Sequence, residues 1–214
     1  MAKRLCHVRV KEQGNTVAVQ RESQTWTTVT AISHPDEIRS YFAHIIRAAS
    51  EDIAIVPSTG TGFAMTMIAH NILRDMQVKF KFQSFSFSFS FSFSFSSKKK
   101  VKLLLLQDEM SSEVYAWQEI AQELEIEFII VPHPTSSQGW MPIILQILQE
   151  HDYNVDICCL PQVHWSDVGS HVDLALIGNV CHLHDIKFVI DGTQSVGIMP
   201  FNVQTIRCHG VQCT

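Results

Sequence analysis

The amino-acid sequence predicts an α/β fold: a three-layer domain in which helices cover both faces of a mainly parallel sheet. Short continuous apolar runs, such as residues 101–106, are typical of strands that are buried on both faces. These runs alternate along the chain with segments whose apolar residues have helical spacing. Hydrophobic residues make up 46% of the 214 residues and charged residues 17%, so the chain can bury a core.

The first predicted helix follows a polar segment, residues 1–33, whose valines and threonines show no clear period. Residues 33–36 (Ser-His-Pro-Asp) are typical of a capping box, with a proline that the first helical turn tolerates. Ile38, Phe42, Ile45 and Ala49 then repeat at helical spacing, so a helix is expected from Ser33 onward.

Strands and helices alternate after this helix. Strands are expected at residues 52–56, 101–106, 127–131, 155–160 and 186–190. Helices are expected at residues 63–76, 113–124, 141–150 and 173–184, and the apolar side of the second of these is predicted to carry Val114, Trp117, Ala121 and Leu124. Because ligands of parallel sheets bind at the carboxyl ends of the strands, the loops after these strands are where a site is expected.

Residues 84–96 interrupt the alternation with a strict Ser-Phe repeat, which Ser97 and three lysines follow. A period of two formally describes a strand with one apolar face. One interpretation is a binding strand or an aggregation-prone device. The other, which low complexity and a pyrimidine-rich coding repeat favour, is an insertion between two elements. We therefore expect residues 84–97 to form a low-complexity insert that lies outside the packed core.

The charge balance argues against two classes of partner. Sixteen Lys and Arg residues against 21 Asp and Glu residues give a net charge of −5, whereas nucleic-acid binding and docking on an anionic membrane need clustered positive charge. No run approaches the roughly 20 apolar residues of a membrane span, and the first residues carry no apolar signal segment. The sequence therefore predicts no nucleic-acid partner and no membrane partner.

The six cysteines are typical of a reducing compartment. They show no C-x-x-C spacing, and Cys158 and Cys159 lie inside an apolar run, as small core residues do. Cys181 and His184 share a helix face, but no second ligand pair is spaced to complete a tetrahedral metal site. We expect a cytoplasmic protein without a metal centre.

Two of the loops after predicted strands carry residues with binding chemistry. Thr59, Gly60 and Thr61 precede a helix, where backbone N–H groups can hold a phosphate. An ordinary glycine turn with a hydroxyl cap is the alternative. Asp191 ends a buried strand, and a carboxylate there is costly unless it meets a pyridinium nitrogen, a metal or a helix start.

A third loop carries His164 and Trp165 beside Asp167. The pair is consistent with a catalytic role. It is equally consistent with a structural role, in which the two rings pack against the loop.

Four segments together resemble the class V aminotransferase family, the pyridoxal-phosphate (PLP) enzymes that include cysteine desulfurases, kynureninase-like enzymes and isopenicillin-epimerase-like lyases. The segments are residues 52–62, 107–117, 161–169 with 172–174, and 188–197. The most specific part of the likeness is Asp191-Gly-Thr-Gln-Ser-Val-Gly197 together with the Val-His-Trp loop. The resemblance implies the large domain of a fold type I PLP enzyme, here in truncated form.

The resemblance also implies a division of the chain. Residues 1–33 would be an irregular segment, and residues 34–205 a partial PLP-binding domain that contains the insert at 84–97. Residues 206–214 would be a divergent tail.

The resemblance implies cofactor contacts at matching positions. Asp191 would pair with the pyridinium nitrogen of PLP and keep the ring an electron sink, and Gln194 would hydrogen-bond on the side of the phenolic oxygen. Thr59, Gly60 and Thr61 would hold the phosphate at the helix start.

Departures from the family pattern bear on activity. Met110 stands where family members often place an aromatic residue or a histidine over the ring, and it cannot act as an acid or a base. The resemblance further implies that His164, which is no departure from the pattern, lines the substrate side of the site. The family's Schiff-base lysine follows the aspartate by roughly two dozen residues, whereas the last lysine here is Lys187, before Asp191. No residue of this chain is therefore assigned a catalytic role.

The resemblance implies a lyase, desulfurase or transaminase that acts on an amino acid and forms a homodimer at full length. Because the lysine is absent, we expect this chain to be incomplete and inactive. The alternatives are a non-catalytic truncated isoform or pseudoenzyme, and an unrelated nucleotide-binding α/β module.

Overall fold

The computed structural model describes residues 5–8, 35–55, 61–85, 100–123, 125–135, 139–150 and 153–213. Seven strands form the central sheet: β1 (Leu5–Val8), β2 (Ile53–Ile55), β3 (Val101–Leu106), β4 (Ile126–Val131), β5 (Ile157–Pro161), β8 (Lys187–Asp191) and β9 (Gly210–Gln212). Their order in the sheet is β2-β1-β9-β8-β5-β3-β4, and all neighbouring strands are parallel. The predicted mainly parallel sheet is confirmed.

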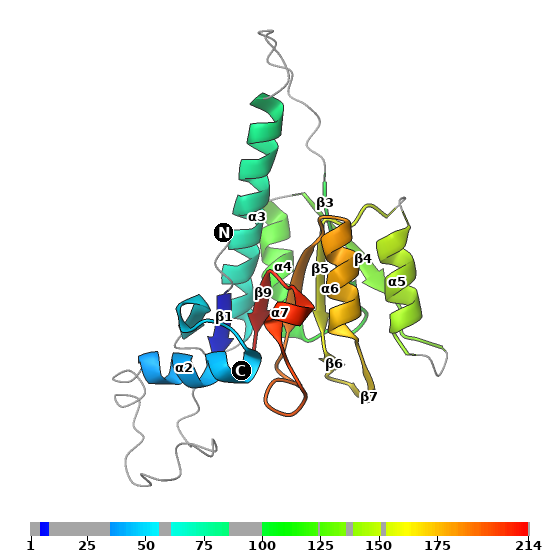
Figure 1. Ribbon diagram of the computed structural model, residues 1–214. Coiled ribbons are helices and arrows are strands. Elements are labelled where there is room, and N and C mark those ends of the chain that lie inside the picture. Colours follow the sequence, from blue (N-terminus) through cyan, green and yellow to red (C-terminus); the bar gives the residue numbers. More distant parts are fainter. Residues whose placement is uncertain are drawn as a thin grey trace.

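Helices lie on both faces of this sheet (Figure 1). They are α2 (Pro35–Ile46), α3 (Thr61–Phe85), α4 (Ser111–Glu123), α5 (Met141–Gln149), α6 (Leu174–Leu183), α7 (Val203–Ile206) and the 3₁₀ helix η2 (Ser50–Asp52). Two short strands, β6 (Val163–His164) and β7 (Asp167–His171), form a separate antiparallel pair after β5.

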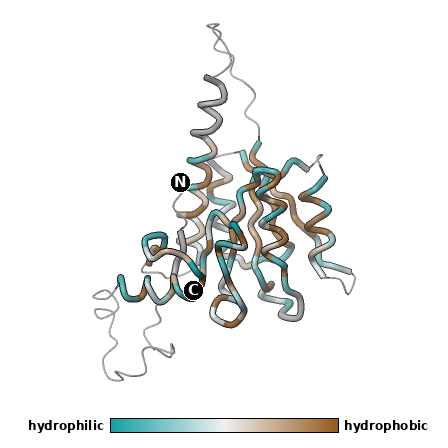
Figure 2. The backbone as a smooth tube through the Cα atoms, in the orientation of Figure 1, coloured by the Kyte–Doolittle hydropathy of each residue, from teal (hydrophilic) through white to brown (hydrophobic). Residues whose placement is uncertain are grey.

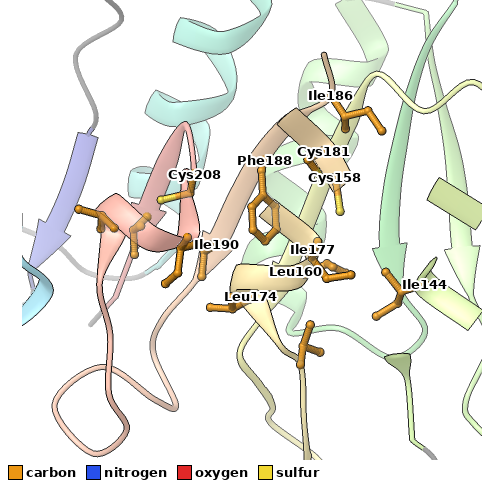
Figure 3. Packing of buried hydrophobic residues seen from close by; sticks show 14 of the residues in the cluster. Ile144, Cys158, Leu160, Leu174, Ile177, Cys181, Ile186, Phe188, Ile190 and Cys208 are labelled. Carbon is orange, nitrogen blue, oxygen red and sulfur yellow. The ribbon is translucent and has the colours of Figure 1, made fainter. Parts of the chain in front are cut away.

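Two apolar clusters hold the three layers together, because successive side chains of a strand point to opposite faces. On β3, Leu103 and Leu105 pack in the cluster that contains Trp117 of α4 and residues of α3. Leu104 of the same strand packs in the cluster formed with α5, α6 and α7. Figure 3 shows this second cluster, in which Phe188 of β8 lies beside residues of α6 such as Ile177. Hydrophobic residues concentrate on these strands and helices (Figure 2).

Local sequence features explain how α6 begins and how closely it packs. The side chain of Asp173 accepts a hydrogen bond from the backbone N–H of Leu176 at 3.0 Å, which caps the helix N-terminus. At Gly178, a Cβ atom would lie 1.8 Å from the carbonyl oxygen of Ile206 in α7. Only glycine therefore allows α6 and α7 to approach this closely.

The predicted elements are confirmed within two residues at their ends, apart from the ends of α2 and α3: the helical spacing extended to Ala49, whereas α2 ends at Ile46. The sequence predicted that α3 ends at Met76, but it continues to Phe85 because no proline or glycine interrupts residues 77–85. Ser84 and Phe85, the first residues of the Ser-Phe insert, are therefore helical rather than extended. Residues 86–97 of the insert lie outside the described residues.

Two strands of the central sheet lie in segments for which the sequence indicated no regular element. β1 comes from the segment expected to be irregular and pairs with β2 and β9. β9 comes from the tail and pairs with β8. Both are too short for a hydrophobic period to show. Gly210 of β9 also gives no strand signal, yet a Cβ atom there would lie 2.9 Å from Ile68 of α3.

Across the part of the chain that the structure describes, no helix combines the length and the apolar character needed to cross a membrane.

Candidate functional site

The candidate site lies where the chain reverses its direction across the sheet. From β3 the chain moves outward to β4, and it then returns to place β5 on the other side of β3. In parallel sheets such a reversal opens a crevice at the carboxyl ends of the strands, where ligands bind. The loops after β3, β5 and β8 meet at this edge. They carry the predicted site residues Met110, His164 and Asp191.

Asp191 is the last residue of β8 and is only 5% exposed. Its Oδ1 accepts a hydrogen bond from the backbone N–H of Thr193 at 2.8 Å. Gln212, its fully buried neighbour on β9, donates from Nε2 to Thr193 Oγ1 at 3.2 Å. Burial raises the pKa of Asp191, and hydrogen bonds from Thr193 oppose that rise. Among the described residues, no lysine or arginine forms an ion pair with this carboxyl group.

Two further acids lie near Asp191, and the sequence did not single them out. Glu113, in the first turn of α4, is fully buried and accepts a hydrogen bond from Cys159 Sγ at 2.8 Å. Glu109 is 8% exposed, and its Oε1 accepts a hydrogen bond from the backbone N–H of Met110 at 3.1 Å. The Oε2 atoms of both glutamates have no hydrogen-bond partner. We refer to Glu109, Glu113 and Asp191 as the acid cluster.

Members of the acid cluster hold protons more tightly than ordinary carboxyl groups. Desolvation raises the pKa of Glu109 to about 7, and the charge of Asp191 adds to this rise. Desolvation also raises the pKa of Glu113 well above its usual value, and the charges of Glu109 and Asp191 increase this effect. The acid cluster therefore keeps protons at neutral pH, and two of its oxygen atoms have no hydrogen-bond partner.

A sequence signal for Glu113 exists in the spacing of α4. The buried residues of this helix follow the spacing i, i+3, i+4 and i+7: Glu113, Ala116, Trp117 and Ile120. Of the predicted apolar side, Trp117 is fully buried, whereas Val114 and Ala121 are only partly buried and Leu124 lies outside the described residues. A glutamate one helical turn before Trp117, on the buried face, indicates an acid that packs against the sheet.

His164 is buried after β5, and its hydrogen bonds define its tautomer. Its Nε2 lies 3.1 Å from the carbonyl oxygen of Gln107, which can only accept, so Nε2 carries the hydrogen atom. Its Nδ1 then accepts from the backbone N–H of Ser166 at 3.4 Å and lies 3.0 Å from the Ser166 hydroxyl. Burial lowers the pKa of His164, which favours the neutral ring.

Aromatic rings surround His164. The ring centroids of Trp140 and His133 lie 5.2 Å and 5.7 Å from that of His164. Trp165 is half exposed, and its Nε1 donates to the carbonyl oxygen of Asp108 at 2.7 Å. These contacts tie the loop after β5 to the loop after β3, as the structural interpretation of the His-Trp pair requires. The role of His164 on the substrate side stays a prediction.

The structure describes only part of the predicted phosphate-binding segment. Thr59 and Gly60 lie outside the described residues, and Thr61 is the first residue of α3. At the next position, Gly62, a Cβ atom would lie 3.1 Å from the carbonyl oxygen of Ser112, so the starts of α3 and α4 lie side by side.

Met110 and Gln194, the other two predicted site residues, differ in how exposed they are to solvent. Met110 is partly buried just before α4, and its carbonyl oxygen accepts hydrogen bonds from the backbone N–H groups of Glu113 and Val114. Gln194 is exposed in the turn after β8. The structure thus places Met110 with the acid cluster, whereas no contact described here ties Gln194 to it. The described ranges contain no group of three or more His, Cys, Asp or Glu side chains arranged to hold a metal ion.

Comparison with models of protein families shows to which family the chain belongs. Residues 89–210, more than half of the sequence, match the model for aminotransferase class V. The chain belongs to the aminotransferase class V family. The resemblance drawn from the sequence motifs is thereby confirmed. No curated protein sequence matches this class V chain.

Solved structures share the fold of this class V chain. A C-DES mutant with glycine covalently linked to the PLP cofactor has 16% sequence identity and a TM-score of 0.62, over 92% of this chain and 46% of that one. The apo cysteine desulfurase of Thermococcus onnurineus NA1 has 16% identity and a TM-score of 0.57, over 87% and 40%. Escherichia coli CsdA, a cysteine desulfurase, has 16% identity and a TM-score of 0.57, over 93% and 42%. The class V chain thus spans less than half the length of these structures.

Proposed function

We propose that this class V chain binds PLP at the carboxyl edge of its sheet, with Asp191 on the pyridine nitrogen of the cofactor. The observation that carries the proposal is the burial of Asp191, which is 5% exposed at the end of β8 and forms no ion pair with a described lysine or arginine. A buried carboxylate is costly unless a cation or a donor meets it. A protonated pyridine nitrogen is both. Membership of the class V family supports the same assignment.

The residues present fit the other parts of the cofactor. The start of α3, at Thr61, is suited to the phosphate because a helix N-terminus attracts anions. The approach of Gly62 to Ser112 brings this helix start next to the segment that begins with Met110. Met110 in turn is adjacent to Glu109 of the acid cluster. The start of α3, Met110 and the acid cluster therefore lie in one region of the molecule, which supports the proposed contacts to the phosphate, the ring face and the ring nitrogen.

Bound PLP supplies an electron sink for reactions at the α-carbon of an amino acid. The substrate we propose is accordingly an amino acid, and the reaction class is that of a lyase, a desulfurase or a transaminase. Asp191 would hold the proton on the ring nitrogen and fix the orientation of the ring. The sequence has no lysine after Asp191, so we expect this chain by itself to bind PLP without a covalent bond and to release it on dialysis.

Equilibrium dialysis of the purified chain against PLP tests the proposal. We expect saturable binding, and an affinity that falls about tenfold to a hundredfold in Asp191→Asn, which corresponds to the loss of one charge-assisted hydrogen bond. Asp173→Asn is the matched control, since asparagine also caps helices and this side chain is exposed. Binding of a nucleotide but not of PLP would contradict the proposal. An unchanged affinity in Asp191→Asn would contradict the assigned contact.

A further inference from the structure

Glu113 lies close to Asp191 within the acid cluster. It belongs to the first turn of α4, and its fully buried side chain reaches β5, where its Oε1 lies 2.8 Å from Cys159 Sγ. Cys159 pairs with Val189 of β8, two residues before Asp191. The carboxyl groups of Glu113 and Asp191 thus lie on the same side of β5 and β8, close enough for their interaction to lower the pKa of Asp191 and raise that of Glu113.

The acid cluster cannot carry three negative charges. Its members are at most 8% exposed, and no described lysine or arginine pairs with them. Buried like charges without a cation force at least one group to keep its proton. The proton goes to the group whose charged form has the poorest solvation.

Glu113 has the poorest solvation of the three acids. It is 0% exposed, and its described donor is the thiol of Cys159, which is a weak one. Burial raises the pKa of Cys159, so the thiol keeps its hydrogen. Asp191, in contrast, accepts a backbone N–H bond from Thr193 at 2.8 Å. Protonated Glu113 has an O–H that needs an acceptor, which also explains why its Oε2 accepts no hydrogen bond.

We propose that Glu113 is a positioning residue of the PLP site: as a neutral acid it donates a hydrogen bond to Asp191, and Asp191 stays the ionised carboxylate that faces the ring nitrogen. The identity of the ring rests on the proposed function. The proton of Glu113 does not move to the cofactor. It holds Asp191 in its charged form and fixes the direction of that carboxylate.

Infrared spectroscopy of the chain without PLP tests the protonation. At about pH 8.5, above the pKa of about 7 of Glu109, we expect the carbonyl stretch of a protonated carboxyl group in the wild type. Glu113→Gln should remove this band, because glutamine has the same shape but no acidic proton. Glu119→Gln, the same change at an exposed position of α4, should leave it. A wild type without the band, or a band that persists in Glu113→Gln, would overturn the proposal.

PLP binding of Glu113 variants tests the positioning role. Glu113→Gln still donates from its amide and should keep the wild-type affinity, whereas Glu113→Leu donates nothing and should bind PLP about tenfold more weakly. Equal affinities of wild type and Glu113→Leu would overturn the positioning role, and circular dichroism shows whether each variant is folded. A wild type that shows the infrared band but binds no PLP would overturn the proposed function and leave the protonation of Glu113 standing.

Discussion

Glu109 lies in the loop between β3 and α4. One of its carboxyl oxygens accepts a hydrogen bond from the backbone N–H of Met110, and the other has no hydrogen-bond partner. Desolvation raises its pKa from 4.5 to about 7. The folded chain therefore binds this proton more tightly than the unfolded chain. Its contribution to stability is complete below pH 4.5 and is lost as the pH rises to about 7. At the scale of the residue, Glu109 therefore makes the fold less stable as the pH rises from about 4.5 to about 7.

Glu109→Gln should weaken this pH dependence. Glutamine does not ionise. Between mildly acidic and mildly alkaline pH, we therefore expect the unfolding free energy of the variant to fall by up to about 3 kcal/mol less than that of the wild type. Urea denaturation at a series of pH values measures this, with Glu119→Gln as the exposed control. A loss in Glu109→Gln as large as that of the wild type would show that Glu109 is already ionised in the folded chain at mildly acidic pH, and would contradict the raised pKa.

Single residues were predictable where their position along the chain defines their chemistry. Asp191 was found because an acid at the end of a buried strand demands a partner. Glu109 and Glu113 were missed because their proximity to Asp191 depends on how α4 packs against β5 and β8. Such proximity is a property of the tertiary structure, and the local sequence shows only an acid on a buried helix face.

At the scale of the element, helix packing depends on individual glycines. Gly178 of α6 touches the backbone of α7, where a Cβ atom would lie 1.8 Å from the carbonyl oxygen of Ile206. A backbone atom cannot move aside as a side chain can. The close approach of α6 and α7 beside β8 therefore requires the glycine, although glycine is a poor helix former.

Gly178→Ala should destabilise the chain by about 2 kcal/mol or more. The cost of overpacking exceeds the gain of about 1 kcal/mol in helix propensity. Asn179→Ala, at the next and exposed position of α6, should be neutral or slightly stabilising. Thermal denaturation of both variants measures the difference. A Gly178→Ala variant at least as stable as the wild type would mean that α6 and α7 lie further apart than described.

Elements were predictable where an apolar run or a helical period was long enough. The strands from β3 to β8 within the central sheet and the helices α4, α5 and α6 met this condition. β1 and β9 did not, since a strand of three or four residues has too few positions for a pattern, and its place depends on neighbours in the sheet. The end of α3 was misplaced because the sequence offers no stop signal there.

At the scale of the whole molecule, the order of the strands creates the site. The reversal between β3 and β5 brings together loops that are far apart in the sequence, from Gln107 to Asp191. The α/β alternation predicted the parallel sheet and the edge at which the loops meet. The positions of β1 and β9 in that sheet, between β2 and β8, could not be derived from the alternation because it does not include them.

The most direct test of this account is the protonation of the ring nitrogen of bound PLP. With PLP that carries ¹⁵N in the ring, the nitrogen chemical shift in the complex reports whether a proton is present. The account predicts a protonated nitrogen in the wild-type complex at a pH where free PLP has lost this proton, and an unprotonated nitrogen in Asp191→Asn. An unprotonated nitrogen in the wild-type complex, or one whose state does not depend on Asp191, would contradict the central claim that the buried acid at the end of β8 holds the cofactor ring.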